Sequence, residues 1–399
     1  MELSVETRAF ISLHATDDVR SLALHAGRYP QVDMAYAVAQ IAGRQCAARK
    51  IPSWSSIDGL RYPKHLSLEQ CSSEPTALYK ASLVSGKSFV DLTGGFGVDC
   101  SFFSRRFQHA FYVERQSELC EIARHNFTLL GLPHVEVVHA EAEEFLHRLD
   151  QVDCIFLDPA RRDDHGGKTF AIEDCTPNVK LLADLLLEKA PCVVVKLSPM
   201  LDLTKAWLDL PCTNEIHVVS VNNECKELLL VMRKGLTEKR IIAVNLKKEA
   251  VERFVLTPEE ERDAACSFAP EVLRFLYEPN ASVMKAGAYK SVAQRYGLQK
   301  LHHNTHLYTS EQLCADFPGR VFVCEGVISF AKKDIKQQMS GIVQANLAVR
   351  NFPASVAELR KRLKIAEGGD CFLFATTLAD ERKVLIKCSR IKKAMDENE

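Results

Sequence analysis

The sequence of 399 residues lacks a long apolar run. The apolar run that begins at Cys192 lies between Pro191 and Lys196, whereas a membrane-spanning helix needs roughly 20 apolar residues. The start of the chain, MELSVETRAF, contains neither the basic region nor the apolar region of a secretory signal. We therefore expect a cytoplasmic protein with no membrane partner.

Neither sign of charge is in excess. Lysine and arginine total 51 against 52 aspartate and glutamate residues, so net charge gives no evidence of a polyanionic partner, and any nucleic-acid surface must be local. The 14 cysteines include no C-x-x-C pair, which argues against a zinc ribbon and a redox motif. We expect mostly buried, reduced thiols, because free cysteine behaves as a small apolar residue.

The length predicts two or three domains, and 47% hydrophobic residues supply their cores. Apolar spacings of three and four predict N-terminal helices, and IPSWSSIDGLRYP then breaks the pattern as a linker does. After residue 236, a helical stretch around PEEERDAACSFAPEVLRFLYEP precedes a mixed α+β region. We place the domains at residues 1–67 (helical cap), 68–235 (α/β), 236–325 (helical linker and small domain) and 326–399 (basic α+β domain).

Residues 88–234 alternate short β-branched runs with amphipathic stretches. The runs SFVDLT, HAFYVE, HVEVVH, VDCIFLD, CVVVKL, EIHVVSV and KELLLVM predict seven strands. Helical patterns fill the first five gaps, whereas only the turn NNEC separates the last two runs. The expected fold is therefore α/β, with a Rossmann-like, mostly parallel seven-stranded sheet that ends in an antiparallel strand.

A glycine-rich segment, Asp91-Leu-Thr93-Gly94-Gly95-Phe-Gly97, follows the first of these strands. Glycines at a strand-to-helix turn let the backbone approach a ligand closely, which suits a nucleoside cofactor. The dinucleotide pattern G-x-G-x-x-G fails because its third glycine is absent, and the phosphate-loop ending G-K-[ST] is also absent. A loop that opens with a carboxylate fits a cationic ligand better than a pyrophosphate.

Further polar elements follow the next three strands. Glu114 ends the second, Glu141 and Ala142 follow the third, and the fourth leads into Asp158-Pro-Ala-Arg161-Arg. Open α/β sheets bind ligands at the carboxyl ends of their strands, so we expect these elements to meet in one crevice.

In this order the motifs resemble those of class I S-adenosylmethionine-dependent methyltransferases, over about residues 68–235. The resemblance implies that the glycine loop lies under the methionine part of the cofactor, that Glu114 binds the ribose, and that Glu141 contacts the adenine. Thr93 stands where the commonest pattern has its first glycine, and Gly94 is added. The implied S-adenosylmethionine residues are Asp91, Thr93, Gly94, Gly95, Gly97, Glu114, Glu141 and Ala142.

The fourth motif resembles the D-P-P-[YF] signature of amino-group methyltransferases, with Arg161 in place of the aromatic residue. We expect Asp158 to orient or deprotonate an acceptor N–H, the Pro159 carbonyl to accept a second hydrogen bond, and Arg161 to stack on a base or bind phosphate. The loop RRDDHGGKTF is either a substrate-ordered lid or a solvated loop. A covalent pyrimidine mechanism would need a thiol, and Cys175 is the only loop cysteine near this edge.

Two shorter patterns have alternative interpretations. Gln70 and Ser72, before the first strand, are cofactor candidates by the same resemblance, but Ser73 with Pro75 also suits a helix start. The histidines of LHHNTH, residues 301–306, are interpreted as a surface group and not as a zinc site, so no metal is expected.

The runs YEPNASVMKAGAY and RNFPASVAELRKRLKIAEGGDCFLFATT resemble a bacterial group of methyltransferases with a THUMP-like C-terminal domain, which also implies a ferredoxin-like unit around residues 280–325. THUMP domains bind RNA, so an RNA substrate (rRNA or tRNA) follows by analogy. Residues 331–395 contain 14 lysines and arginines against 6 acids. The RNA-contact candidates are Arg360, Lys361, Arg362, Lys364, Lys387 and Arg390. The alternatives are a protein or small-molecule methyltransferase, a non-catalytic RNA-binding protein that retains cofactor binding, and an ordinary basic surface.

Overall fold

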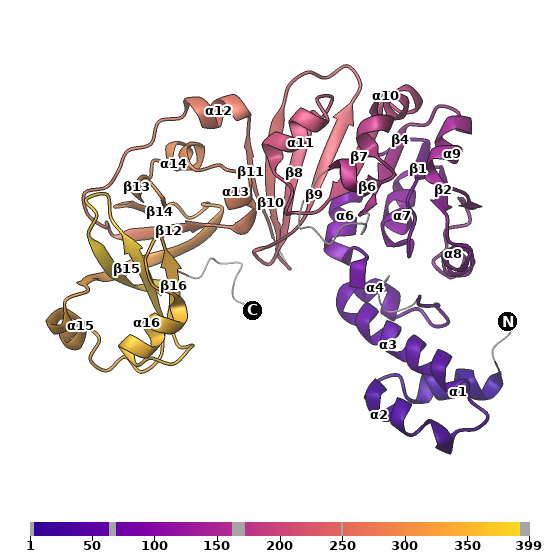
Figure 1. Cartoon of the computed structure of the whole chain (residues 1–399), viewed down its shortest axis with the longest axis horizontal. Helices are drawn as coiled ribbons and strands as arrows, with labels where there is room; N and C mark the ends of the chain where they lie inside the picture. Colours follow the sequence, from indigo (N-terminus) through magenta and orange to yellow (C-terminus); the bar gives the residue numbers. More distant parts are fainter. Residues whose placement is uncertain (1–3, 64–68, 162–171, 249, 392–399) are drawn as a thin grey trace. The chain divides into compact units, whose positions relative to one another are not determined.

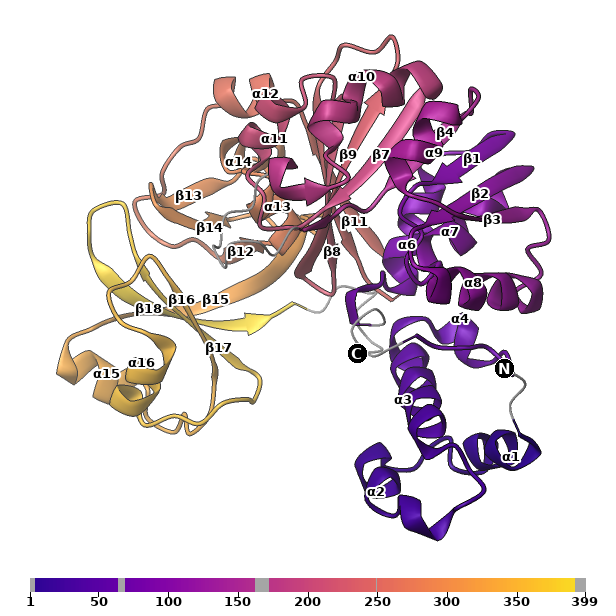
Figure 2. The same cartoon turned by 45° about the vertical axis from the view of Figure 1, so that its right-hand side comes forward.

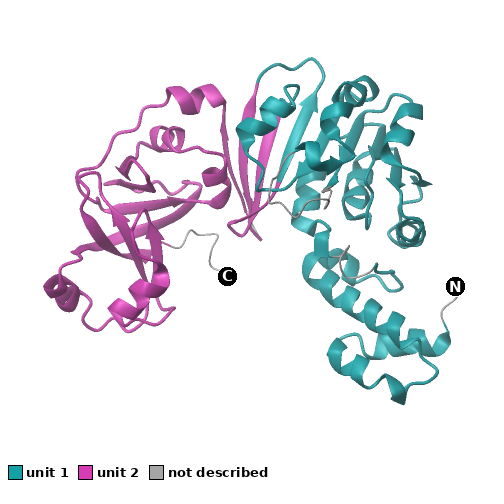
Figure 3. Cartoon of the chain, in the orientation of Figure 1, with its two compact units in different colours: residues 1–214, 228–238 teal, residues 215–227, 239–399 magenta. Residues whose placement is uncertain are grey.

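The computed structural model describes residues 4–63, 69–161, 172–248 and 250–391, except for the side chain of Arg161. The chain divides into two compact units, drawn in teal and magenta in Figure 3. The first consists of residues 1–214 and 228–238, and the second of residues 215–227 and 239–399. No helix in these described ranges has the length and apolar character needed to cross a membrane.

The expected N-terminal helices are present. Ser4, Asp18 and Asp33 each accept a hydrogen bond from a first-turn backbone N–H, which explains where three of the helices begin. Their apolar residues, Phe10 and Leu22 among them, form a small core of their own. The helices are α1 (Val5–Leu13), α2 (Val19–Leu24), α3 (Met34–Lys50) and α4 (Pro52–Ser55), with a 3₁₀ turn at Ala26–Arg28.

The interpretation of residues 51–63 as a linker was wrong. Trp54 in α4 is 2% exposed, and its ring packs edge-on against Phe96 of the glycine-rich loop at a centroid distance of 5.1 Å. Tyr62 is also buried, and its backbone exchanges two hydrogen bonds with the Gln40 side chain. Pro52 and Gly59 mark turns of a packed segment. The sequence could not show the packing, because turn residues alone do not indicate whether the segment between them is buried.

All seven expected strands form in one sheet. The strands β7, β4, β1, β2 and β3 are parallel neighbours in that order, which can be followed in Figure 2, and β9 runs antiparallel to β7. Asn222 and Asn223 adopt positive φ in the turn between β8 and β9. The bounds are β1 (Ser88–Asp91), β2 (His109–Glu114), β3 (Val135–His139), β4 (Cys154–Leu157), β7 (Cys192–Leu197), β8 (Glu215–Val221) and β9 (Glu224–Arg233).

Two further strands, β10 (Arg240–Leu246) and β11 (Val251–Leu256), extend this sheet to nine strands in the order β11-β10-β8-β9-β7-β4-β1-β2-β3. β10 pairs in parallel with β8, and β11 pairs antiparallel with β10. The expected sheet ended before residue 236. Local periodicity identifies a strand but not its partner, so this extension was not visible in the sequence.

Helices pack on the sheet from both sides (Figure 1). Residues of α6 (Glu74–Ser82), α7 (Val98–Phe103) and α8 (Ser117–Leu129) share one core cluster with β1, β2 and β4. The helices α9 (Ala142–Arg148) and α10 (Val179–Lys189) contact β2 and β7 from outside that cluster. The remaining short elements are α11 (Leu203–Asp209), β5 (Ala160–Arg161), β6 (Cys175–Thr176) and 3₁₀ turns at Ser104–Arg106 and Ile172–Asp174.

The second unit contains a seven-stranded sheet with the order β13-β14-β12-β15-β18-β17-β16. Its strands are β12 (Phe275–Pro279), β13 (Gln299–His302), β14 (Thr305–Ser310), β15 (Gly319–Ser329), β16 (Asn346–Arg350), β17 (Cys371–Thr377) and β18 (Lys383–Arg390). Its helices are α12 (Pro258–Asp263), α13 (Ala281–Lys285), α14 (Lys290–Tyr296), α15 (Lys332–Gln338) and α16 (Val356–Leu363).

The long helical stretch expected after Thr257 was wrong. Only α12 is helical, where Thr257 and Glu260 form a capping box, and FLYEP is the buried strand β12. A strand buried on both faces has no alternating pattern, so its apolar run looks the same as part of a helix.

Candidate active site

Three acidic residues predicted to converge lie at the ends of neighbouring strands. Asp91 ends β1, Glu114 ends β2, and Asp158 follows β4. Because β4, β1 and β2 are adjacent and parallel, these residues lie at one edge of the sheet. Glu141, after β3, is next along the same edge.

The glycine-rich loop is tightly packed against β2. Gly94 donates its N–H to the Val113 carbonyl at 2.8 Å, and a Cβ on Gly94 would lie 2.3 Å from the Tyr112 ring. Gly95 and Gly97 have φ of 54° and 86°, a region that other residues rarely adopt. The Tyr112 hydroxyl also donates to the Gly95 carbonyl. Steric fit therefore explains why glycine is needed at Gly94, and backbone conformation explains it at the other two positions.

The buried Glu114 carboxylate connects two turns of this edge. One oxygen accepts the N–H of Gly95 at 2.9 Å, and the other accepts the N–H of Gln116 at 2.9 Å. Each carboxylate oxygen has a second lone-pair position, so both can still accept a hydrogen bond from a ligand. The sequence predicted this acid as a ligand-binding group, and the structure adds that it fixes the loop.

Asp91 is fully buried within a group of acids. Burial raises the pKa of its carboxyl well above the ordinary value, the hydrogen bond from the Thr93 N–H opposes this, and the charges of Asp99, Asp158 and Glu114 add to the rise. Carboxyl groups gathered in this way favour a cationic ligand. Both the acids and the glycine loop therefore fit a positively charged nucleoside derivative.

Asp158 is more accessible than Asp91, Asp99 and Glu114, with 37% of its side chain exposed. Its backbone N–H donates to the Thr93 hydroxyl at 2.6 Å, so the first and fourth motifs are directly linked. Its carboxylate forms an ion pair with Lys196 near the end of β7. The carboxylate can accept further hydrogen bonds, since it offers about four lone-pair positions.

Sequence reasoning missed a buried ionic cluster next to Asp158. The Asp99 carboxylate lies 3.2 Å from the fully buried Lys80 ammonium and 3.8 Å from that of Lys196, and it accepts the Ser72 hydroxyl at 2.7 Å. Burial raises the pKa of Asp99, but the two lysines and Ser72 outweigh it, so the net direction is downward. No sequence signal marked Lys80, because lysine in a helix usually indicates a solvated face.

The remaining cofactor candidates differ in accessibility. Gln70 is exposed, whereas Ser72 is buried and bonded to Asp99, Lys80 and Lys196. Glu141 is exposed before the first turn of α9, and Ala142 is the first residue of that helix. The interpretation of Ser73 and Pro75 as a helix start is confirmed, since Ser73 is the N-cap of α6 and Pro75 lies in its first turn.

The fourth motif is only partly described. Pro159 is buried, and the Arg161 backbone pairs with Cys175 of β6. Cys175 itself is buried and not in an open loop. The Arg161 side chain and residues 162–171, which include the expected lid, lie outside the described residues.

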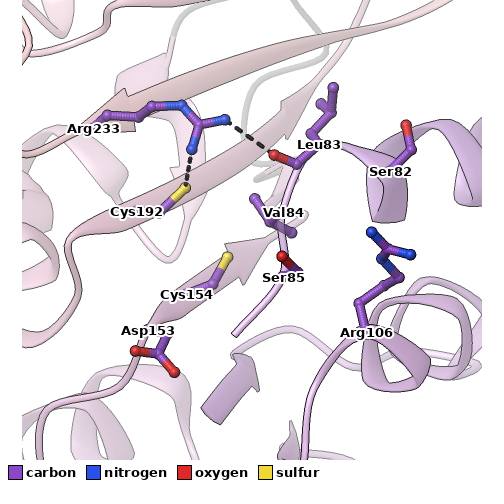
Figure 4. Close-up of a pocket in the computed structure, with 9 residues that line it drawn as sticks. All are labelled: Ser82, Leu83, Val84, Ser85, Arg106, Asp153, Cys154, Cys192 and Arg233. Atoms are coloured by element: carbon purple, nitrogen blue, oxygen red, sulfur yellow. Dashed lines mark hydrogen bonds between the residues drawn. The ribbon is translucent and has the colours of Figure 1, made fainter. Parts of the chain in front are cut away.

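A pocket of about 240 Å³ lies at the opposite edge of the sheet (Figure 4). Asp153 precedes β4, Cys192 begins β7, and Arg233 ends the antiparallel β9, so all three lie at this amino edge. The Arg233 guanidinium donates to the Leu83 carbonyl at 3.1 Å and to Cys192 Sγ at 3.5 Å. The pocket is thus separate from the acid-rich edge.

The histidine group of residues 302–306 lies around the β13–β14 turn. His302 contacts Glu381 at 3.0 Å and Asn351 at 2.9 Å, whereas His306 stacks on Tyr289 with a centroid distance of 3.8 Å. Burial and nearby Lys300 lower the pKa of His306 to about 4. Within the described residues, no group of three or more potential ligands is arranged to hold a metal ion.

Three family models match the chain. Residues 76–204 match "Conserved hypothetical protein 95", residues 275–318 match a ferredoxin-like domain, and residues 319–390 match a THUMP domain-like model. The last two agree with the ferredoxin-like and THUMP-like units that the sequence resemblance implied.

The chain is also similar to two individual proteins, one curated sequence and one crystal structure. A curated protein of Sulfolobus acidocaldarius named for cobalt-precorrin-6B C(15)-methyltransferase (decarboxylating) activity is 31% identical over 90 residues, which are 22% of this chain. That match spans about half, 47%, of the curated relative. A crystal structure from Porphyromonas gingivalis W83, named as a candidate methyltransferase, is 37% identical with a TM-score of 0.88, and the match covers 98% of this chain and 100% of that one.

The relationship to the Porphyromonas structure extends over nearly the whole of both chains, through the α/β sheet and both C-terminal units. The chain therefore belongs to the class I methyltransferases that carry ferredoxin-like and THUMP-like C-terminal domains.

Proposed function

We propose that this methyltransferase takes its methyl group from S-adenosylmethionine and transfers it to a base in structured RNA. The observation that carries the cofactor assignment is the joining of the glycine loop to Glu114 beside the buried Asp91. The acceptor assignment depends on Asp158 and on the basic C-terminal domain.

The residues of the edge suit this cofactor in three ways. The acids around Asp91 favour its sulfonium and ammonium charges. Glu114 can accept hydrogen bonds from ribose hydroxyls, and Glu141 is the exposed candidate for the adenine. When bound, S-adenosylmethionine supplies an electrophilic methyl group.

Asp158 is the group placed to orient the acceptor. An ion pair with Lys196 holds its carboxylate, and a hydrogen bond from its backbone N–H to the Thr93 hydroxyl holds its main chain. A fixed carboxylate that accepts an N–H from a base amino group aligns the nitrogen lone pair for transfer and provides a route for the proton. Arg161 is proposed to stack on the base or bind its phosphate.

The C-terminal domain supplies the argument for RNA. Lys361, Arg362 and Lys364 are exposed at the end of α16, and α15, which lies beside α16 in Figures 1 and 2, adds further exposed lysines. Arg360, in contrast, pairs with Glu367 at 3.6 Å, and Lys387 pairs with Glu325 at 3.1 Å. Arg390 lies on β18. We therefore propose the ends of α15 and α16 as the main phosphate-binding surface.

Cofactor binding is tested first, because it does not require the acceptor. Isothermal titration of S-adenosylmethionine should show Kd at least tenfold higher for Glu114→Gln, about 1.4 kcal/mol, and unchanged for the exposed control Glu121→Gln. Unchanged affinity in Glu114→Gln would refute this cofactor site.

The acceptor is tested by transfer of tritiated methyl to total RNA and to total protein from a strain deleted for the gene. The proposal requires label in RNA that falls at least 100-fold with Asp158→Asn but not with the exposed control Asp150→Asn. Label in protein would indicate a protein methyltransferase. Cofactor binding without label in either pool would leave a small-molecule acceptor or a non-catalytic RNA-binding protein.

A further inference from the structure

Two cysteines face one another across β15 and β18. Cys324 and Cys388 are direct partners in the antiparallel register of these strands, next to an irregularity at Gly326. The Cys324 N–H donates to the Arg274 carbonyl at 2.9 Å, and therefore points away from β18. The pair is thus of the non-hydrogen-bonded type, in which opposite Cα atoms are about 4.5 Å apart.

The two side chains also lie on the same face of the sheet. Cys388 belongs to the core cluster that contains Phe322 and Phe374, and the partly buried Cys324 packs against that cluster. Cys371 on the neighbouring strand β17 packs in a different cluster, because it pairs with Ser389 and points to the opposite face. A disulfide needs Cα atoms about 4.4 to 6.8 Å apart and side chains directed toward each other. Of the three thiols Cys324, Cys371 and Cys388, only Cys324 and Cys388 meet these two conditions as a pair.

Access and chemistry distinguish the two partners. Cys324 is partly exposed, whereas Cys388 is fully buried. The neighbouring Cys388 thiol lowers the pKa of Cys324 despite the partial burial of Cys324. The neighbouring Cys324 and burial raise the pKa of Cys388. Cys324 is therefore the thiol that a small oxidant meets in its reactive form.

We propose that Cys324 and Cys388 form a reversible dithiol–disulfide site, oxidised by hydrogen peroxide, that covalently joins β15 to β18. The Cys324 thiolate attacks a peroxide oxygen, the O–O bond breaks, and Cys324 sulfenic acid and hydroxide form. The Cys388 sulfur then attacks the sulfenic sulfur, the S–O bond breaks, and the S–S bond forms. The two thiols lose two hydrogens in total, and one peroxide becomes two water molecules.

The site is independent of methyl transfer, so its test needs no substrate. Reduced full-length protein is titrated with hydrogen peroxide, its remaining thiols are alkylated, and it is digested with trypsin. The expected product is a linked pair of the peptides at residues 321–332 and 388–390, about 2 Da lighter than the two reduced peptides together. Dithiothreitol should restore both thiols.

Two variants identify the roles of the partners. Cys388→Ser should leave Cys324 as a sulfenic acid that reacts with dimedone, with at least a fivefold increase in that adduct over the wild type. The matched control Cys371→Ser, on the opposite face of the same sheet, should form the linked peptides as the wild type does. The proposal is overturned if peroxide oxidises other cysteines while Cys324 and Cys388 stay alkylatable, or if they oxidise without becoming linked.

Discussion

The buried ionic cluster at Asp99 gives a sharp prediction. Asp99→Asn removes the carboxylate that lies 3.2 Å from the Lys80 ammonium, which is 0% exposed. Lys196 keeps its ion pair with Asp158, so most of the cost falls on Lys80. Removing one partner of a buried ion pair typically costs about 3 to 5 kcal/mol, and we expect a loss of that size in the free energy of unfolding.

The two tryptophans make this measurement specific. Trp54 and Trp207 both belong to the first unit, so tryptophan fluorescence during urea unfolding reports the unit that contains Asp99. The double variant Lys80→Met/Asp99→Leu removes both charges and should recover most of the loss, to within about 2 kcal/mol of wild type. A loss below about 1 kcal/mol for Asp99→Asn, or a double variant no better than the single one, would refute the reasoning.

The same cluster predicts a pH dependence with a defined sign. Burial alone raises the pKa of Asp99, but Lys80 and Lys196 lower it below its ordinary value overall. A carboxyl with a lowered pKa in the folded state stabilises the protein above its ordinary pKa, and this contribution is lost as pH falls through the lowered value. Wild-type stability should therefore fall more steeply than that of Asp99→Asn below about pH 4.

Further predictions follow from the glycine loop, from the buried acid beside it and from the C-terminal helix. Gly94→Ala should cost about 1 to 3 kcal/mol in urea unfolding because its Cβ meets Tyr112, whereas Gly27→Ala, with no atom nearby, should change stability by less than about 0.5 kcal/mol. Burial raises the pKa of Asp91, so the stability of the protein falls as pH rises through that pKa and the buried carboxyl becomes charged. Asp91→Asn should therefore raise Tm by about 2 °C or more at pH 8 and by less at pH 5. A pH-independent Tm difference would contradict this. The same variant should weaken S-adenosylmethionine binding at least tenfold. Replacing Lys361 and Lys364 by alanine should lower RNA affinity and reduce the slope of log affinity against log salt by roughly 1 per residue, and an unchanged slope would exclude this surface.

Much of the fold could be predicted from local pattern. The seven β-branched runs became strands, and the asparagines between the last two allowed the hairpin. The errors came from segments whose burial or strand pairing depends on residues distant in the sequence. Trp54 packs against Phe96, and β10 joins the sheet by pairing in parallel with β8. Neither partner is near in sequence, so periodicity contains no information on them.

The sequence by itself determined the acid-rich edge, because acids that end consecutive parallel strands must lie together once the sheet forms. It also determined the glycine loop, where a side chain at Gly94 would clash with Tyr112 and the backbone at Gly97 lies in a region that other residues rarely adopt. Only the tertiary structure decided that Lys80 would be buried against Asp99, that Lys196 would bind Asp158, and that two thiols 64 positions apart would be neighbours. These contacts join elements distant in the chain, and their energies depend on burial, which composition and spacing do not specify.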